Sequence, residues 1–250
     1  MKRIPPLSCF KAYDIRGRLG DELNEDIAYR IGRAYAEVIG VGRVVLGRDV
    51  RPTSVSLADQ VARGLMAAGA EVHDLGLSGT EETYFATTHL AADGGICITA
   101  SHNPMDYNGM KMVKTGSAPI NNSEGMSAIK ALAESGKFSP KKVGGKLIDA
   151  SATREAYVDK LMEFIDIAAV RPLKVLVNAG NGTAGPSFDT LATALAKAGA
   201  PIEFIRIHHT PDGSFPVGIP NPLLNENWHL TAAPVISHGA DMGVAWDGDF

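Results

Sequence analysis

The chain has 250 residues, of which 45% are hydrophobic and 21% are charged, and its formal net charge is -4 at neutral pH. This composition is typical of a soluble globular protein, and the length suffices for one large or two medium domains with a buried core. The negative charge without a basic stripe argues against a nucleic-acid-binding protein, and no apolar run is long enough to predict a membrane span.

Helix and strand patterns alternate along the first half of the chain. Short β-branched runs predict buried strands, whereas segments with an N-capping residue and a closing glycine, such as Asn24 and Gly40, predict helices. The expected strands cover residues 43–47, 71–76, 94–100 and 108–113, and the expected helices cover residues 24–40, 53–69, 79–90 and 122–136. Such alternation predicts a largely parallel sheet with helices on both faces.

The composition changes between Gly136 and Ala150, where glycine and lysine become frequent. We interpret this change as the exit from a first domain, and predict a first domain over residues 1–145 and a second over residues 146–250. In the second half, the expected helices cover residues 152–165, 187–199 and 230–239, and the expected strands cover residues 173–178, 201–207 and 241–250. The predicted fold class is therefore α/β, with two similar three-layer α/β/α domains that contain mixed, largely parallel sheets.

A proline-rich loop at residues 208–227 interrupts the second half. Its four prolines predict rigid turns, and a loop of this length is expected to lie near a functional site. Two further loops follow strands: "GRDVR" at residues 47–51 and "NAGNGTAG" at residues 178–185. The first favours an internal ion pair, and the second favours a tight strand-to-helix turn because it lacks the lysine of a phosphate-binding loop.

Ser101 follows the strand expected at residues 94–100, and ligands of open α/β sheets bind at the carboxyl ends of strands. Its position alone still favours a cap or turn residue, and no G-x-S-x-G pattern indicates a hydrolase. Asp247 and Asp249 flank Gly248 after an apolar strand. Carboxylates at this spacing can share a Mg²⁺ ion, although the spacing alone favours a solvated turn.

Three segments together resemble the phosphohexomutases, the phosphoglucomutase/phosphomannomutase family. "TASHNP" followed by "DYNG" and a lysine, within residues 98–113, resembles the family's phosphoserine signature. "FKAYDIRG" at residues 10–17 resembles its N-terminal active-site segment, and the closing "DGD" resembles its metal loop, D-G-D-x-D-R. This resemblance reverses the interpretation of Ser101 and of the two aspartates as turn residues.

The resemblance implies three sets of site residues. The catalytic set is Ser101, which carries the phosphoryl group, with Lys111 and His102 for proton transfer or charge neutralisation. The substrate-binding set is Tyr13, Arg16 and Asn103. The metal set is Ser101, Asp247 and Asp249, which are expected to hold Mg²⁺. An arginine suits such a site because its guanidinium binds phosphate oxygens through two donors.

The implied reaction interconverts mannose (or glucose) 6-phosphate and 1-phosphate through a hexose 1,6-bisphosphate, which is also the expected activator. Phosphoglucosamine mutase activity, or a fragment that only binds a phosphosugar, remain alternatives. The likeness stops at Phe250, inside the metal loop, so we expect an N-terminal fragment that is inactive alone.

The expected partners of this protein are small hexose phosphates, with no nucleic acid and no membrane. We expect the parent protein to be a monomer or weak dimer. The two cysteines lack metal-ligand spacing, and the N-terminus does not read as a signal peptide, so the expected location is the cytoplasm.

Overall fold

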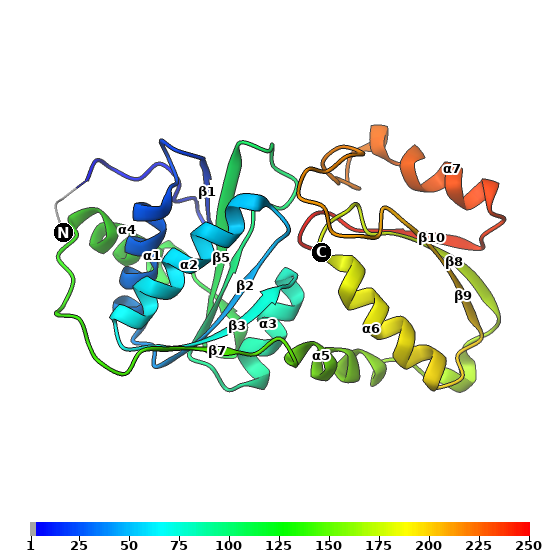
Figure 1. The fold of residues 1–250 in the computed structure, drawn as a ribbon, viewed down its shortest axis with the longest axis horizontal. Helices are drawn as coiled ribbons and strands as arrows, with labels where there is room; N and C mark the ends of the chain where they lie inside the picture. Colours follow the sequence, from blue (N-terminus) through cyan, green and yellow to red (C-terminus); the bar gives the residue numbers. More distant parts are fainter. Residues whose placement is uncertain (1–3) are drawn as a thin grey trace.

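The computed structural model describes residues 4–250, which form two α/β units side by side (Figure 1). The first unit contains a seven-stranded sheet with the order β1-β5-β4-β2-β3-β7, and β6 also pairs with β5. The strands are β1 (Asp14–Arg18), β2 (Arg43–Arg48), β3 (Glu71–Leu77), β4 (Gly94–Ile98), β5 (Tyr107–Lys114), β6 (Ala118–Pro119) and β7 (Lys146–Asp149). The helices of this unit are α1 (Glu25–Ile39), α2 (Pro52–Ala67), α3 (Thr80–His89) and α4 (Met126–Ser135).

The first sheet is mixed. β2 runs parallel to β3 and β4, and β7 runs parallel to β3, whereas β5 is antiparallel to both β1 and β4. Successive side chains of a strand point to opposite faces, so Val44 and Leu46 join the core with α1, α2 and α4 while Val45 packs in a smaller core with Ala86 of α3. The sheet is thus the middle of three layers.

The second unit has a three-stranded parallel sheet with the order β10-β8-β9. Its strands are β8 (Leu173–Asn178), β9 (Ile202–Ile207) and β10 (Met242–Ala245), and its helices are α5 (Thr153–Met162), α6 (Ala184–Lys197) and α7 (His229–Ser237). α6 and α7 lie on opposite faces of this sheet (Figure 1). The 3₁₀ turns of the two units are η1 (Thr115–Ser117), η2 (Asn122–Glu124), η3 (Ile167–Ala169) and η4 (Asn225–Asn227). The predicted fold class, α/β with three-layer units, is confirmed, with a mixed sheet in the first unit and a parallel sheet in the second.

Local sequence explains where the first helices begin. The Asn24 side chain accepts a hydrogen bond of 3.0 Å from the backbone N–H of Ile27, and Gly40 ends α1 in the left-handed conformation at φ 76°. α2 starts earlier than predicted, at Pro52 instead of Thr53. Proline suits the first turn of a helix because the N–H that it lacks has no partner there.

The predicted domain boundary between residues 145 and 146 has to be corrected. Residues Lys146–Asp149, which the prediction assigned to the second domain, form β7 and pair in parallel with β3 of the first sheet. The backbone hydrogen bonds of β7 therefore belong to the first unit. The change of unit lies after Asp149, where α5 begins at Thr153 and packs against both α3 and α6.

None of the helices within residues 4–250 has the length and apolar character needed to cross a membrane. Cys9 and Cys97 are both buried free thiols.

A pair of glycines allows α1 and α2 to pack closely. A Cβ added to Gly32 would lie 2.5 Å from the carbonyl oxygen of Val61, and one added to Gly64 would overlap the carbonyl oxygen of Tyr29. Neither backbone can move without separating the helices. We therefore expect Gly64→Ala to lower the free energy of unfolding by about 1–3 kcal/mol through overpacking, although alanine alone would favour the helix by about 1 kcal/mol.

Urea unfolding followed by circular dichroism measures this effect. Arg63→Ala, at an exposed position of the same helix, is the control and is expected to change the unfolding free energy by no more than about 0.5 kcal/mol. A gain in stability for Gly64→Ala would contradict the close packing of the two helices.

Candidate active site

Ser101 lies in the turn that follows β4, at the boundary between the two units. Its backbone is held in the left-handed region at φ 51°, which is uncommon for a residue other than glycine. The Ser101 N–H donates to Thr99 Oγ1 at 2.8 Å. The side chain donates a short hydrogen bond from Oγ to Oδ2 of Asp247, which belongs to the second unit. The serine hydroxyl thus faces a carboxylate that is distant in the sequence.

The two aspartates after β10 have different partners. Asp247 Oδ2 accepts from Ser101 Oγ and lies 3.5 Å from His102 Nδ1. Asp249 is buried, and its Oδ2 lies 2.8 Å from Lys111 Nζ and accepts a 2.9 Å hydrogen bond from Thr80 Oγ1. One carboxylate therefore faces the serine, and the other, itself buried, forms an ion pair with the partly buried lysine.

This difference in partners separates the pKa values of the two carboxyl groups. Burial, followed by the negative charge of Asp249, raises the pKa of Asp247. Burial would also raise the pKa of Asp249, but the charge of Lys111 and hydrogen bonds outweigh it and lower that pKa. Asp249 is thus ionised and neutralised by Lys111. Among the described residues, the ion-pair contact of Asp247 is the 3.5 Å one to His102 Nδ1, which is charged only when protonated, so Asp247 is the carboxylate more open to a nearby cation.

The atoms around Ser101 Oγ fit a hard cation. The donors are a hydroxyl and two carboxylates, and Mg²⁺ prefers oxygen ligands of this kind. Within the described part of the chain, no group of three His, Cys, Asp or Glu side chains could hold a metal by itself. A cation at this position would therefore take further oxygen ligands besides the two carboxylates, and Ser101 Oγ is placed to be one of them.

Arg16 and Lys111 come to the site on neighbouring antiparallel strands. In the register of β1 and β5, Asp14 lies opposite Lys111. Arg16 Nη1 donates to the carbonyl oxygen of Thr99 at 2.9 Å, and its Nη2 pairs with Asp14 at 2.8 Å. Arg16 thus bonds the backbone just before Ser101 and is partly neutralised by Asp14, whereas Lys111 reaches the site through its contact with Asp249.

The remaining three predicted residues take different positions. The His102 ring is partly exposed, with Nδ1 3.2 Å from Ser101 Oγ. The Asn103 side chain donates to the carbonyl oxygen of Ala100 at 2.9 Å, so it closes the turn. Tyr13 is 70% exposed just before β1, and none of the hydrogen bonds within residues 4–250 joins it to Ser101 or the aspartates.

The sequence prediction missed Thr80, the first residue of α3. Besides the bond from its hydroxyl, Thr80 donates a backbone hydrogen bond of 2.8 Å to the carbonyl oxygen of Asp249. The N-terminus of α3 therefore fixes the aspartate at the end of the other unit. The run "SGTEE" indicates a helix start, but it carries no signal of a partner that far along the chain.

The turn at residues 178–185 packs against the aspartate loop, residues 247–249. Thr183 donates from its backbone N–H to the carbonyl oxygen of Gly248 at 3.2 Å. A Cβ on Gly182 would lie only 2.8 Å from that same oxygen. The turn thus holds the loop through a close backbone contact.

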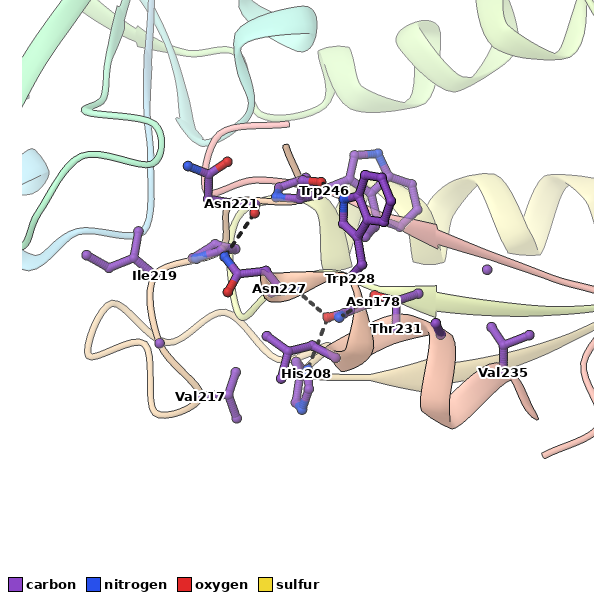
Figure 2. Close-up of a pocket in the computed structure, with 18 of the residues that line it drawn as sticks. Asn178, His208, Val217, Ile219, Asn221, Asn227, Trp228, Thr231, Val235 and Trp246 are labelled. Carbon is purple, nitrogen blue, oxygen red and sulfur yellow. Dashed lines mark hydrogen bonds between the residues drawn. The ribbon is translucent and has the colours of Figure 1, made fainter. Parts of the chain in front are cut away.

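A separate pocket of about 490 Å³ lies between α7 and the loop around Ile219. Figure 2 shows Trp228 and Trp246 at this pocket, with Asn178 hydrogen-bonded to both His208 and Thr231. Ser101 is not among its lining residues. Trp246 directly precedes Asp247, so one wall of the pocket is continuous with the aspartate loop.

Comparison with known proteins relates this geometry to a family. The family model for phosphoglucomutase/phosphomannomutase alpha/beta/alpha domain I matches residues 8–140, and the model for domain II matches residues 155–250. The chain belongs to the phosphoglucomutase/phosphomannomutase family. The resemblance inferred from the serine, tyrosine-arginine and aspartate motifs is thereby confirmed.

The chain is also similar to individual members of the family. It is 58% identical over 247 residues to a phosphomannomutase of Escherichia coli, and 56% identical over 245 residues to one of Salmonella montevideo. Each alignment covers 98% of this chain and 54% of the relative. A crystal structure of a phosphoglucomutase/phosphomannomutase family protein from Burkholderia thailandensis matches with a TM-score of 0.84 and 33% identity, over 98% of this chain and 54% of the other. The chain thus spans about half the length of these relatives.

Proposed function

We propose that the protein containing this chain is a phosphohexomutase that interconverts mannose (or glucose) 6-phosphate and 1-phosphate. The observation that carries the proposal is the contact between Ser101 Oγ and Asp247, with Arg16 bonded to the backbone of Thr99 and Lys111 paired with Asp249 beside it. The relatives named phosphomannomutase favour mannose phosphates as substrates.

In this reaction, Ser101 carries a phosphoryl group on Oγ. The bond between phosphorus and Oγ breaks while a bond forms to the free hydroxyl oxygen of the hexose monophosphate. The proton of that hydroxyl leaves, and Oγ ends the step protonated. The product of the step is a hexose 1,6-bisphosphate. When this bisphosphate has reoriented at the site, its other phosphate is transferred to Ser101 Oγ, and the second hexose monophosphate leaves.

The neighbouring side chains suit this transfer. A transferring phosphoryl group spreads negative charge over its oxygens, so catalysis depends on positioning and on charge stabilisation. Lys111 and Arg16 place positive charge at the turn. His102 Nδ1, 3.2 Å from Oγ, lies within reach to hold or return a proton.

The acidic residues suit a bound cation. Asp247, Asp249 and an oxygen on Ser101 would hold Mg²⁺, and the ion would supply Lewis-acid stabilisation of the phosphoryl oxygens. The part-buried carboxylate of Asp247, which is 23% exposed and has no lysine or arginine ion pair among the described residues, supports this assignment because removing a carboxylate from water is costly without a cation.

A coupled assay of the full-length protein tests the proposal. With Mg²⁺ and a trace of hexose 1,6-bisphosphate, mannose 1-phosphate or glucose 1-phosphate is expected to be converted to the 6-phosphate. No conversion of either sugar would overturn the proposed function. The 250-residue chain alone is expected to show no turnover in the same assay.

A further inference from the structure

Arg51, immediately before α2, is buried under the turn that carries Ser101. It is only 2% exposed, and its guanidinium bonds four backbone carbonyl oxygens of that turn. Nη2 donates to Ser101 at 3.0 Å and to Asn103 at 2.5 Å. Nη1 donates to Pro104 at 2.9 Å and to Tyr107 at 3.2 Å.

These contacts use four of the five donors of the Arg51 guanidinium. Arginine has five N–H donors in a rigid planar fork, and the four on the two terminal nitrogens are all used here. The fifth, on Nε, lies 3.5 Å from Oδ2 of Asp49 in an ion pair that is buried on both sides, but it makes no hydrogen bond among the described residues. The ion pair predicted within residues 47–51 is therefore present, and it is joined to the turn.

Asp49 holds the other end of the same turn. Its Oδ2 accepts a 3.3 Å hydrogen bond from the backbone N–H of Ala100, and its Oδ1 accepts from the Ser54 hydroxyl and from the N–H of Arg51. The backbone before Ser101 is thus bonded to Asp49, and the backbone from Ser101 onward is bonded to Arg51. Both polar backbone groups of Ser101 itself have partners.

This arrangement explains how a serine keeps a positive φ. A residue in the left-handed region is strained and stays there only if its surroundings fix it. The fixed backbone directs Oγ toward Asp247 across the boundary between the units. We propose that Arg51, oriented by Asp49, is a positioning residue that holds Ser101 for phosphoryl transfer. This inference rests on the proposed function.

The second unit covers this residue. The Phe215 ring, from the proline-rich loop, lies 5.7 Å from the Arg51 guanidinium, and Phe215 is itself buried. A Cβ on Gly248 would lie 3.7 Å from Phe215 Cζ and 3.1 Å from the carbonyl oxygen of Ser101. Arg51 therefore lies where the serine turn, the aspartate loop and the proline-rich loop meet.

Arg33 offers a matched control in the same unit. It is also 2% exposed, donates to the carbonyl oxygens of Ala67 and Ser139, pairs with Glu37, and has the Phe138 ring at 5.4 Å. None of these contacts involves the turn of Ser101. Substitution of either arginine by alanine removes a buried guanidinium that bonds several backbone carbonyl oxygens, but only Arg51 bonds the backbone of Ser101.

The test compares Arg51→Ala with Arg33→Ala in the full-length protein, at a temperature where both remain folded by circular dichroism. We expect kcat of Arg51→Ala to fall by about 10²-fold or more with KM little changed, because small misplacement of a reacting group costs this much. Added guanidinium ion at non-denaturing concentration is expected to restore part of the rate. Arg33→Ala is expected to keep a near-normal kcat and to show no such rescue.

The outcomes separate this inference from the proposed function. If the unaltered protein itself converts no hexose phosphate, the proposed function fails. If it is active and Arg51→Ala matches Arg33→Ala in kcat, the positioning role is overturned while the function stands. Should Arg51→Ala not fold, Arg51→Lys replaces it. Lysine keeps the charge but lacks the planar fork, so the same loss of kcat is expected, and a normal kcat would overturn the role.

Discussion

Ser101→Ala is expected to abolish both phosphoryl uptake and mutase turnover. The substitution removes Oγ, the only atom that the proposed reaction uses to carry phosphate through both of its halves. Loss of a catalytic nucleophile costs about 10⁴-fold or more in kcat. Intact mass spectrometry after incubation with hexose 1,6-bisphosphate should show one added phosphoryl group on the unaltered protein and none on the variant.

Ser187→Ala provides the control for this experiment. Ser187 is a buried serine of α6, and its Oγ has no hydrogen-bond partner among the described residues. Its removal is expected to leave both the added mass and the turnover unchanged. Normal turnover of Ser101→Ala would refute the role of the Ser101 hydroxyl as phosphoryl carrier, regardless of the result for Ser187→Ala.

Asp247→Asn is expected to lower mutase activity without lowering the stability of the fold. The amide keeps the size of the side chain and can still accept a hydrogen bond from Ser101, but it lacks the charge that would hold Mg²⁺. Metal stabilisation of a phosphoryl group is worth several kcal/mol. Because each 1.36 kcal/mol is a factor of ten, kcat/KM should fall by about 10³-fold at normal Mg²⁺ concentration.

The expected gain in stability follows from the direction of the Asp247 pKa. A carboxyl group whose pKa is raised by folding destabilises the native state when it is ionised, so at neutral pH the charge of Asp247 opposes folding. The neutral amide removes this cost, and urea unfolding without Mg²⁺ should show a midpoint equal to or above that of the unaltered protein. A Mg²⁺ titration of activity completes the measurement.

Asp26→Asn is the matched control for the aspartate substitution. Asp26 is an exposed carboxylate at the start of α1, and it pairs with Arg30 at 2.7 Å. The control is expected to leave the dependence of activity on Mg²⁺ unaltered. If Asp247→Asn shows the same dependence on Mg²⁺ as the control, Asp247 is not a ligand.

Sequence patterns predicted the elements whose ends are determined by residues within the element itself. α1 was identified from Asn24 and Gly40 because a cap and a closing glycine act within one turn of their helix. β1 and β7 were missed for the opposite reason. "DIRGR" contains one aliphatic side chain and "KLID" is largely exposed, and each becomes a strand only by pairing with a distant strand. The predicted domain boundary was misplaced because of the second omission.

Contacts between distant segments also limited the prediction of the site. The motifs identified Ser101, Lys111, Asp247 and Asp249 as site residues, but the spacing of the aspartates could not show which residue each of them contacts. The two carboxylates take separate partners because β10 ends between the serine turn and the N-terminus of α3, so that each side chain meets a different segment. Thr80 and Arg51 act on the site through backbone contacts with segments far along the chain, and residue type alone does not indicate such contacts.

The contact between Ser101 and Asp247 joins the two α/β units. Thr80 and Lys111 bind Asp249 across the same boundary, and Arg154 pairs with Glu82 of α3 at 2.7 Å. A small rotation of one unit against the other would displace Asp247 and Asp249 relative to Ser101. The proposed phosphoryl transfer would therefore depend on how the two units dock, and it could be lost while every helix and strand stays intact.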